Sequence, residues 1–230
     1  MRHARLCTFI LSLLALPFTL AACVNGVNGS VDVNAASSVS DASTVNGSVR
    51  LQTKAKADVA STVNGSIHLD GGAQAGTADT VNGDITLEKD ATVAADASTV
   101  NGALSLAPGS AVNGELSNVN GRIEIDGAHV GKGISTVNGD IHLTGSTVIN
   151  GGIQVGKAHG NGQGNSFFGF HFGSNSSAMP RIVIDAGVVV NGPLTFERPV
   201  TLYVSDQAKV AGPITGASAV KFSGAAPPES

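Results

Sequence analysis

The string Ser61-Thr62-Val63-Asn64-Gly65-Ser66-Ile67, STVNGSI, decides the fold, because the chain repeats it with little change at 43–49 and 135–141. Six Val-Asn-Gly groups between Val45 and Gly139 form one regular series, at intervals of 18, 18, 19, 19 and 18 residues. A period this short and regular is typical of a solenoid, in which each repeat stacks on its neighbours. The six Asn-Gly pairs are Asn46 and Gly47, Asn64 and Gly65, Asn82 and Gly83, Asn101 and Gly102, Asn120 and Gly121, and Asn138 and Gly139.

A finer period of six lies inside the repeat. Apolar or small residues recur every six positions from Val45 to Val93, and a second one often stands two positions earlier, as Ile67 does before Leu69. Alternation with period two predicts a strand whose paired apolar residues point to one side. The sequence therefore predicts an all-β, single-stranded, three-faced parallel β-helix of about nine coils, with about 18 residues per coil. The 19-residue intervals are expected to hold one extra residue at a corner.

The Asn-Gly pair falls at the same place in every coil and therefore predicts a corner. Glycine is expected to supply the positive φ of a sharp turn, and stacked asparagines to hydrogen-bond from coil to coil as a ladder. In this interpretation the preceding valines, such as Val45 and Val63, face the interior. The threonines before them then face outward, in a row interrupted by Asn118 that consists of Thr44, Thr62, Thr80, Thr99 and Thr136.

The first 23 residues indicate the compartment. A basic start precedes an apolar run that is too short to span a membrane and ends in small residues, as in a secretory signal peptide. Leu20-Ala21-Ala22-Cys23 resembles the lipobox of bacterial lipoproteins. The resemblance implies that Cys23 carries the lipid, palmitate included, and anchors the chain to a membrane. Val24 after the cysteine implies, by the same resemblance, the outer membrane of a Gram-negative bacterium.

The repeat is interrupted once, by a segment rich in Gly, Asn and Ser, and the six-residue series resumes from Ile184 to Ile214. VVNGPL at 189–194 is expected to form the same corner again. Four phenylalanines in the interruption predict an apolar contact patch; they are Phe167, Phe168, Phe170 and Phe172. The predicted organisation is a signal peptide over 1–22, coils over 23–157, a loop excursion over 158–179, further coils over 180–222 and a disordered tail over 223–230.

Composition argues against several functions. The 13 Lys and Arg against 17 Asp and Glu give a net charge of −4, or −6 without Arg2 and Arg5, so the chain lacks the basic surface of a nucleic-acid-binding protein. We expect no enzyme activity, cofactor or metal site. His159 and His171 lie in the interruption without carboxylates to complete a ligand set. Glu124, expected beside a histidine of the next coil, predicts an exposed charge pair rather than a catalytic one.

Arranged on coils, TVNGSIHL (62–69) and TVNGDIHL (136–143) resemble the adhesin family of bacterial β-solenoid lipoproteins, and residues 180–215 resemble the polymer-forming bactofilins. The resemblance implies a right-handed coil, whereas the six-residue spacing alone favours a left-handed one. It also implies an adhesin-like or structural role at the cell envelope, with a surface polymer or a protein ligand as partner. Two alternatives stay open: a scaffold that associates end to end, and an outward threonine face that binds a ligand or ice.

Overall fold

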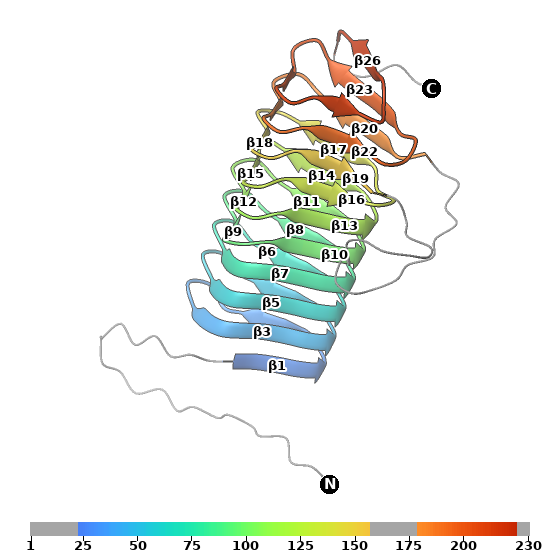
Figure 1. Ribbon diagram of the computed structural model, residues 1–230. Helices are drawn as coiled ribbons and strands as arrows, with labels where there is room; N and C mark the ends of the chain where they lie inside the picture. The colour runs from blue at the N-terminus through green and yellow to red at the C-terminus, as the bar shows by residue number, and fades with distance from the viewer. Residues whose placement is uncertain (1–22, 157–178, 225–230) are drawn as a thin grey trace, which may run out of the picture.

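The computed structural model of the chain describes residues 23–156 and 179–224, and in these residues the chain forms strands and turns without a helix. The strands stack into one column, with β1 (Cys23–Asn28) at one end and β26 (Ala219–Phe222) at the other (Figure 1). Neighbouring strands pair in parallel, and most pairs join residues 18 or 19 positions apart. The predicted all-β solenoid is therefore confirmed.

Face 1 of the solenoid is a ten-stranded sheet with one strand from each coil. The ten strands correspond to ten coils, one more than the sequence predicted. At a spacing of about 4.8 Å they make a column roughly 45 Å long. In order of pairing the strands are β2 (Val31–Val33), β4 (Val49–Leu51), β6 (Ile67–Leu69), β8 (Ile85–Leu87), β11 (Leu104–Leu106), β14 (Ile123–Asp126), β17 (Ile141–Thr144), β20 (Arg181–Ile184), β23 (Thr201–Ser205) and β26.

Faces 2 and 3 belong to a second sheet, of 16 strands. In the first coils, strands of nine residues run across both faces without a break: β3 (Ser38–Asn46), β5 (Lys56–Asn64) and β7 (Gln74–Asn82). Beyond β7 the faces separate. Face 2 continues as β9 (Thr92–Val93), β12 (Ala111–Val112), β15 (His129–Val130), β18 (Val148–Ile149), β21 (Val189–Val190) and β24 (Lys209–Val210). Face 3, which begins with β1, continues as β10 (Ala97–Asn101), β13 (Leu116–Asn120), β16 (Ile134–Thr136), β19 (Ile153–Val155), β22 (Leu194–Phe196) and β25 (Ile214–Thr215).

The coil is right-handed. In Figure 1 the strands β1, β3 and β5 cross the front of the column from left to right, and the chain then passes behind them to face 1 while it climbs towards β26. This hand agrees with the family resemblance and not with the six-residue spacing.

The extra residue of the first 19-residue coil lies at the corner between faces 2 and 3. Ala75 pairs with Val93, 18 positions on, whereas Ala78 pairs with Ala97, 19 positions on. The added residue therefore enters between Val93 and Ala97, which is where the continuous strands give way to separate ones. The predicted corner insertion is confirmed and assigned to this corner.

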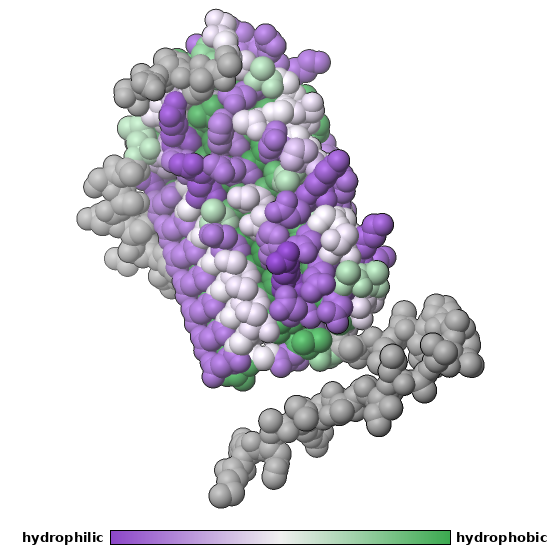
Figure 2. Space-filling view, turned by 180° about the vertical axis from the view of Figure 1, so that it is seen from behind, coloured by the Kyte–Doolittle hydropathy of each residue, from purple (hydrophilic) through white to green (hydrophobic). Residues whose placement is uncertain are grey.

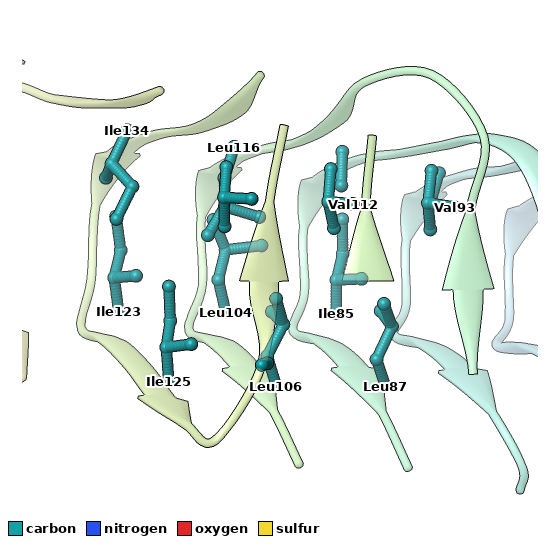
Figure 3. Packing of buried hydrophobic residues seen from close by; sticks show 14 of the residues in the cluster. Ile85, Leu87, Val93, Leu104, Leu106, Val112, Leu116, Ile123, Ile125 and Ile134 are labelled. Carbon is teal, nitrogen blue, oxygen red and sulfur yellow. The ribbon is translucent and has the colours of Figure 1, made fainter. Parts of the chain in front are cut away.

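The interior is a narrow apolar column, formed by side chains that point inward from all three faces. On face 1 two inward columns run up the stack, one through Ile85 and Leu104 and the other through Leu87 and Leu106, and their side chains are buried. Figure 3 shows these side chains meeting those of Val93 and its neighbours from the facing strands. Burial of each such side chain contributes about 1.5–3 kcal/mol, which makes this column the main source of stability.

The orientation predicted for the valine and threonine rows is wrong. Thr62 and Thr80 are each only 5% exposed, whereas Val45 and Val63 are 41% and 40% exposed. Strand alternation turns the residue after an inward threonine outward, although further up the row Val100 and Val119 are only 6% and 3% exposed. The inward positions of face 3 are thus taken by small residues such as Ala78 and by the threonines.

The interruption occupies the corner between faces 3 and 1. β17 pairs with β20, so that Ile141 lies beside Ile182, 41 positions on rather than 18. The predicted loop and its four phenylalanines lie outside the described residues, as do the predicted signal peptide and all but the first two residues of the tail. VVNGPL does not repeat the first corner: Asn191 lies between faces 2 and 3, where its Nδ2 donates to Asn150 Oδ1 at 3.3 Å.

Candidate functional site

The Asn-Gly corner, which joins face 3 to face 1, carries a ladder of side-chain hydrogen bonds. Each asparagine donates from Nδ2 to Oδ1 of the asparagine one coil nearer the N-terminus, at 2.9–3.0 Å. The predicted ladder is therefore present, and it extends one coil further than predicted, to Asn28. All amides point the same way, so each interior member is both a donor and an acceptor. The ladder therefore joins consecutive coils along this corner.

Space requires glycine at all six corner positions, whereas the expected positive φ occurs at only two of them, Gly47 (φ 156°) and Gly121 (φ 135°). Gly65, Gly83, Gly102 and Gly139 do not adopt positive φ. A Cβ at Gly83 would lie 2.0 Å from the carbonyl oxygen of Gly65, and the same clash with the coil below recurs at the other five glycines. The left-handed turn that each coil needs lies instead after face 1, at positions such as Lys54, Gly72 and Asp90.

The inward threonines tie coils together from inside. Thr62 Oγ1 donates to the carbonyl oxygen of Gly47 at 2.8 Å, and Thr44, Thr80 and Thr99 repeat this bond at 2.9 Å. Asn118 replaces threonine in the same row, and its Nδ2 donates to Gly102 at 2.7 Å. An inward row cannot present hydroxyls to solvent, so the outward threonine face proposed for ice or another ligand does not exist.

Two buried polar atoms stand out in that row. Asn118 Oδ1 and Thr136 Oγ1 have no hydrogen-bond partner among residues 23–156 and 179–224. A buried polar atom without a partner costs free energy. The threonine row is therefore stabilising along β3, β5, β7 and β10, and costs free energy where it ends.

The outer surface of face 1 carries most of the exposed charge pairs. Arg50 binds Asp70 at 3.1 Å, and His68 lies 3.2 Å from the same carboxylate. Further up the column, Arg122 binds Glu124 at 2.9 Å. Figure 2, which views the column from the side opposite to Figure 1, shows hydrophilic residues along one edge of the lower coils and mixed over the face. Exposed pairs of this kind contribute about 0–1 kcal/mol each.

The predicted neighbours Glu124 and His142 lie in register, but they do not form the pair that was expected. His142 Nε2 lies 2.9 Å from Asp185 Oδ2, and Glu124 accepts from Arg122. The hydrogen bond that Arg122 donates to Glu124, followed by the negative charge of Glu124, raises the pKa of Arg122. Each of the two carboxylates thus has its own basic partner.

A shallow hollow lies on face 1 between these pairs. It has a volume of about 380 Å³, and its polar lining includes Thr86, Ser105, Glu124, His142 and Thr144. The lining comes from consecutive coils, so its groups repeat at the coil spacing of about 4.8 Å. This spacing suits a contact with an extended partner better than the enclosure of a small molecule.

Two carboxylates beside face 3 have raised pKa values. Burial is the main cause at Asp79, where hydrogen bonds from Ser98 and Thr77 oppose the rise. Burial also raises the pKa of Glu115, with the charge of Asp96 adding to it and Lys132 opposing. The two groups lie in different coils, and among the described residues no group of three or more His, Cys, Asp or Glu could hold a metal ion.

Cys23 is the first residue of β1 and is an exposed free thiol. Its Sγ lies 3.5 Å from Ser40 Oγ. The valines that follow on the same strand, Val24 and Val27, are 37% and 68% exposed. No helix in the described ranges is long and apolar enough to cross a membrane. Nothing in the structure therefore obstructs chemistry at this thiol.

No family model, curated protein or solved structure matches the chain.

Proposed function

We propose that the protein is a lipid-anchored, non-catalytic β-solenoid of the cell envelope, with an adhesin-like or structural role. The observation that carries the proposal is the position of Cys23. It follows the apolar N-terminal run directly in the sequence, and its exposed thiol stands at the first residue of the solenoid. Two or three acyl chains on this residue anchor a protein durably, since each buried methylene contributes about 0.8 kcal/mol.

The proposed contact surface for a partner is the outer side of face 1. Its charges are paired and its side chains repeat at the coil spacing, which suits a surface polymer or an extended protein segment. The three carboxylates that line the shallow hollow, those of Glu88, Glu124 and Asp126, are all exposed, whereas general acid-base sites enclose theirs. These features support a recognition or structural role.

Lipid attachment is tested by producing the full chain in a Gram-negative bacterium with a palmitate analogue that can be labelled. Cys23→Ser should abolish labelling and release the protein from membranes, whereas Cys7→Ser, in the N-terminal run, should leave both unchanged. Equal labelling of the wild type and Cys23→Ser would refute the anchor. Separation of inner and outer membranes on a density gradient then tests the expected outer-membrane location.

A polymer-forming scaffold is the second candidate, because the C-terminal end exposes Ile214 and Val220. One feature argues against it. Lys221 lies in register with Val204, in the inward column that Leu, Ile or Val occupies in the earlier coils. A further coil stacked here would bury that ammonium group, and an inward charge at a sheet edge is a known barrier to edge-to-edge association. Electron microscopy of the Cys23→Ser protein should show single short rods, and ordered filaments would favour the scaffold.

A further inference from the structure

The distance between the proposed lipid and the folded rod is set by β1. Cys23 is itself a paired residue of the sheet, opposite Asp41, and the pairing continues to Asn28 opposite Asn46. Every pair has the same offset of 18 residues, Val27 is the one residue of β1 without a partner among the described residues, and β1 begins at Cys23 itself. A lipid attached to Cys23 therefore brings the N-terminal end of the solenoid to the membrane surface.

At this end of the solenoid β1 and β2 are both strand edges, and β2 carries the exposed Asp32; at the other end β24 and β26 carry Lys209 and Lys221. Among the described strands β1 pairs with β3 alone, so its outer edge is open. Val24 lies in register with the buried Ala42 yet is 37% exposed, because none of the described strands lies beneath it, and Val27 is 68% exposed. β1 carries no charged side chain, and Asp41 is the one charged residue in register with it.

We propose that the lipid bilayer itself covers this end. With Cys23 acylated, β1 lies in the headgroup region with Val24 and Val27 against the acyl boundary, and the rod stands away from the membrane. An interfacial element is buried to a depth of about 5–10 Å, enough to take up one strand and its exposed side chains. Val27 lies four residues from the anchor, about 13 Å along the strand, so the two are held near the same level.

The inference rests on the proposed lipid anchor, and the two can fail separately. The chain has no Trp, so Val27→Trp introduces a single emitter at an exposed position of β1, and Val220→Trp places the matched probe at the opposite end. Both acylated proteins are reconstituted into phosphatidylcholine and phosphatidylglycerol vesicles with brominated acyl chains. Circular dichroism confirms that each variant keeps its β-sheet signal.

The expected result is a blue shift and strong quenching for Val27→Trp, with neither for Val220→Trp. A ten-residue Gly-Ser insertion between Cys23 and Val24 should restore the emission seen in water while the protein stays on the vesicles. An acylated Val27→Trp protein that emits as it does without vesicles overturns the inference, as does quenching that persists after the insertion. Absence of the acyl mass in the mass spectrum overturns the anchor itself, and the inference with it.

Discussion

Arg198 closes the C-terminal end of the asparagine ladder at Asn138. Its Nη1 donates to Asn138 Oδ1 and, at 3.0 Å, to the carbonyl oxygen of Val137. The next coil has no asparagine at this corner because the interruption replaces it, and Arg198 comes from the coil beyond. A guanidinium group thus donates to the last amide of the ladder.

Arg198→Met should destabilise the protein by about 1–3 kcal/mol, since it removes charge-assisted hydrogen bonds at a half-buried position while keeping most of the aliphatic stem. Urea denaturation followed by circular dichroism measures the change. The matched variant is Arg50→Met, which breaks the exposed pair with Asp70 and should cost less than about 1 kcal/mol. Equal losses would show that Arg198 is an ordinary surface charge.

An asparagine in the middle of the ladder should contribute more to the free energy of unfolding than the asparagine at its end. Asn82→Ala removes two hydrogen bonds, to Asn64 and from Asn101, whereas Asn28→Ala removes one. Exposed hydrogen bonds contribute about 0.5–1 kcal/mol each, so the first variant should lose roughly twice as much stability. Thermal melting compares the two, and indistinguishable melting temperatures would mean that the ladder stabilises nothing.

Gly83→Ala should be severely destabilising, by about 3 kcal/mol or more, because the new methyl group meets the Gly65 carbonyl oxygen at 2.0 Å. Because the new Cβ would clash with a backbone atom, no side chain can move aside to relieve the contact. Gly71→Ala is the control: its Cβ would lie 3.5 Å from the nearest atom, and a change within about 0.5 kcal/mol is expected. Soluble yield and unfolding midpoint measure both, and a well-folded Gly83→Ala protein would refute the spacing argument.

The threonine row predicts opposite effects for one substitution at two places. Thr80→Val deletes the bond to Gly65 and should cost about 1 kcal/mol. Thr136→Val deletes a buried hydroxyl that has no partner in the described part of the chain, so it should be neutral or stabilising. The unfolding midpoints of the two variants measure both effects. A larger loss of stability for Thr136→Val than for Thr80→Val would contradict the assignment of Thr136 Oγ1 as a buried hydroxyl without a partner in the described residues.

The contribution of Asp79 to the free energy of unfolding should fall as pH rises. Burial places its pKa in the folded chain above the ordinary value of 3.8, so folding favours the protonated form. The contribution is complete below the unfolded pKa and is lost as pH rises through the folded pKa. Asp79→Asn should therefore raise the melting temperature at pH 7 and match the wild type near pH 3. Parallel pH profiles for the two proteins would contradict this assignment.

Most of the fold could be predicted from the repeat, because every coil has the same pattern of strand and corner residues. The repeat identified the columns through Leu51 and Leu69, the ladder, and the inserted corner residue. It could not fix which of Thr62 and Val63 points inward, since both are β-branched and strand alternation is equally regular in either phase. The deciding contact is a hydrogen bond to a carbonyl in another coil. Asn118, a polar residue able to make the same bond, was the one available signal.

Other features depend on contacts that no local pattern encodes. Arg198 reaches Asn138 across 60 positions, and only because the intervening coil lacks the corner. The reason for glycine that all six corners share likewise lies in the coil below, since only Gly47 and Gly121 also have positive φ. Lys221 could have been found, because it breaks the apolar series at a position that earlier coils fill with Leu, Ile or Val.

The parallel register has a mechanical consequence. The hydrogen bonds between coils run along the axis of the rod, so a pull on its two ends loads them one coil at a time, as in opening a zipper, and not all together in shear. Each coil that yields converts about 4.8 Å of rod into roughly 60 Å of extended chain. Under tension such a protein would lengthen stepwise and dissipate work, and so act as an extensible tether at low force.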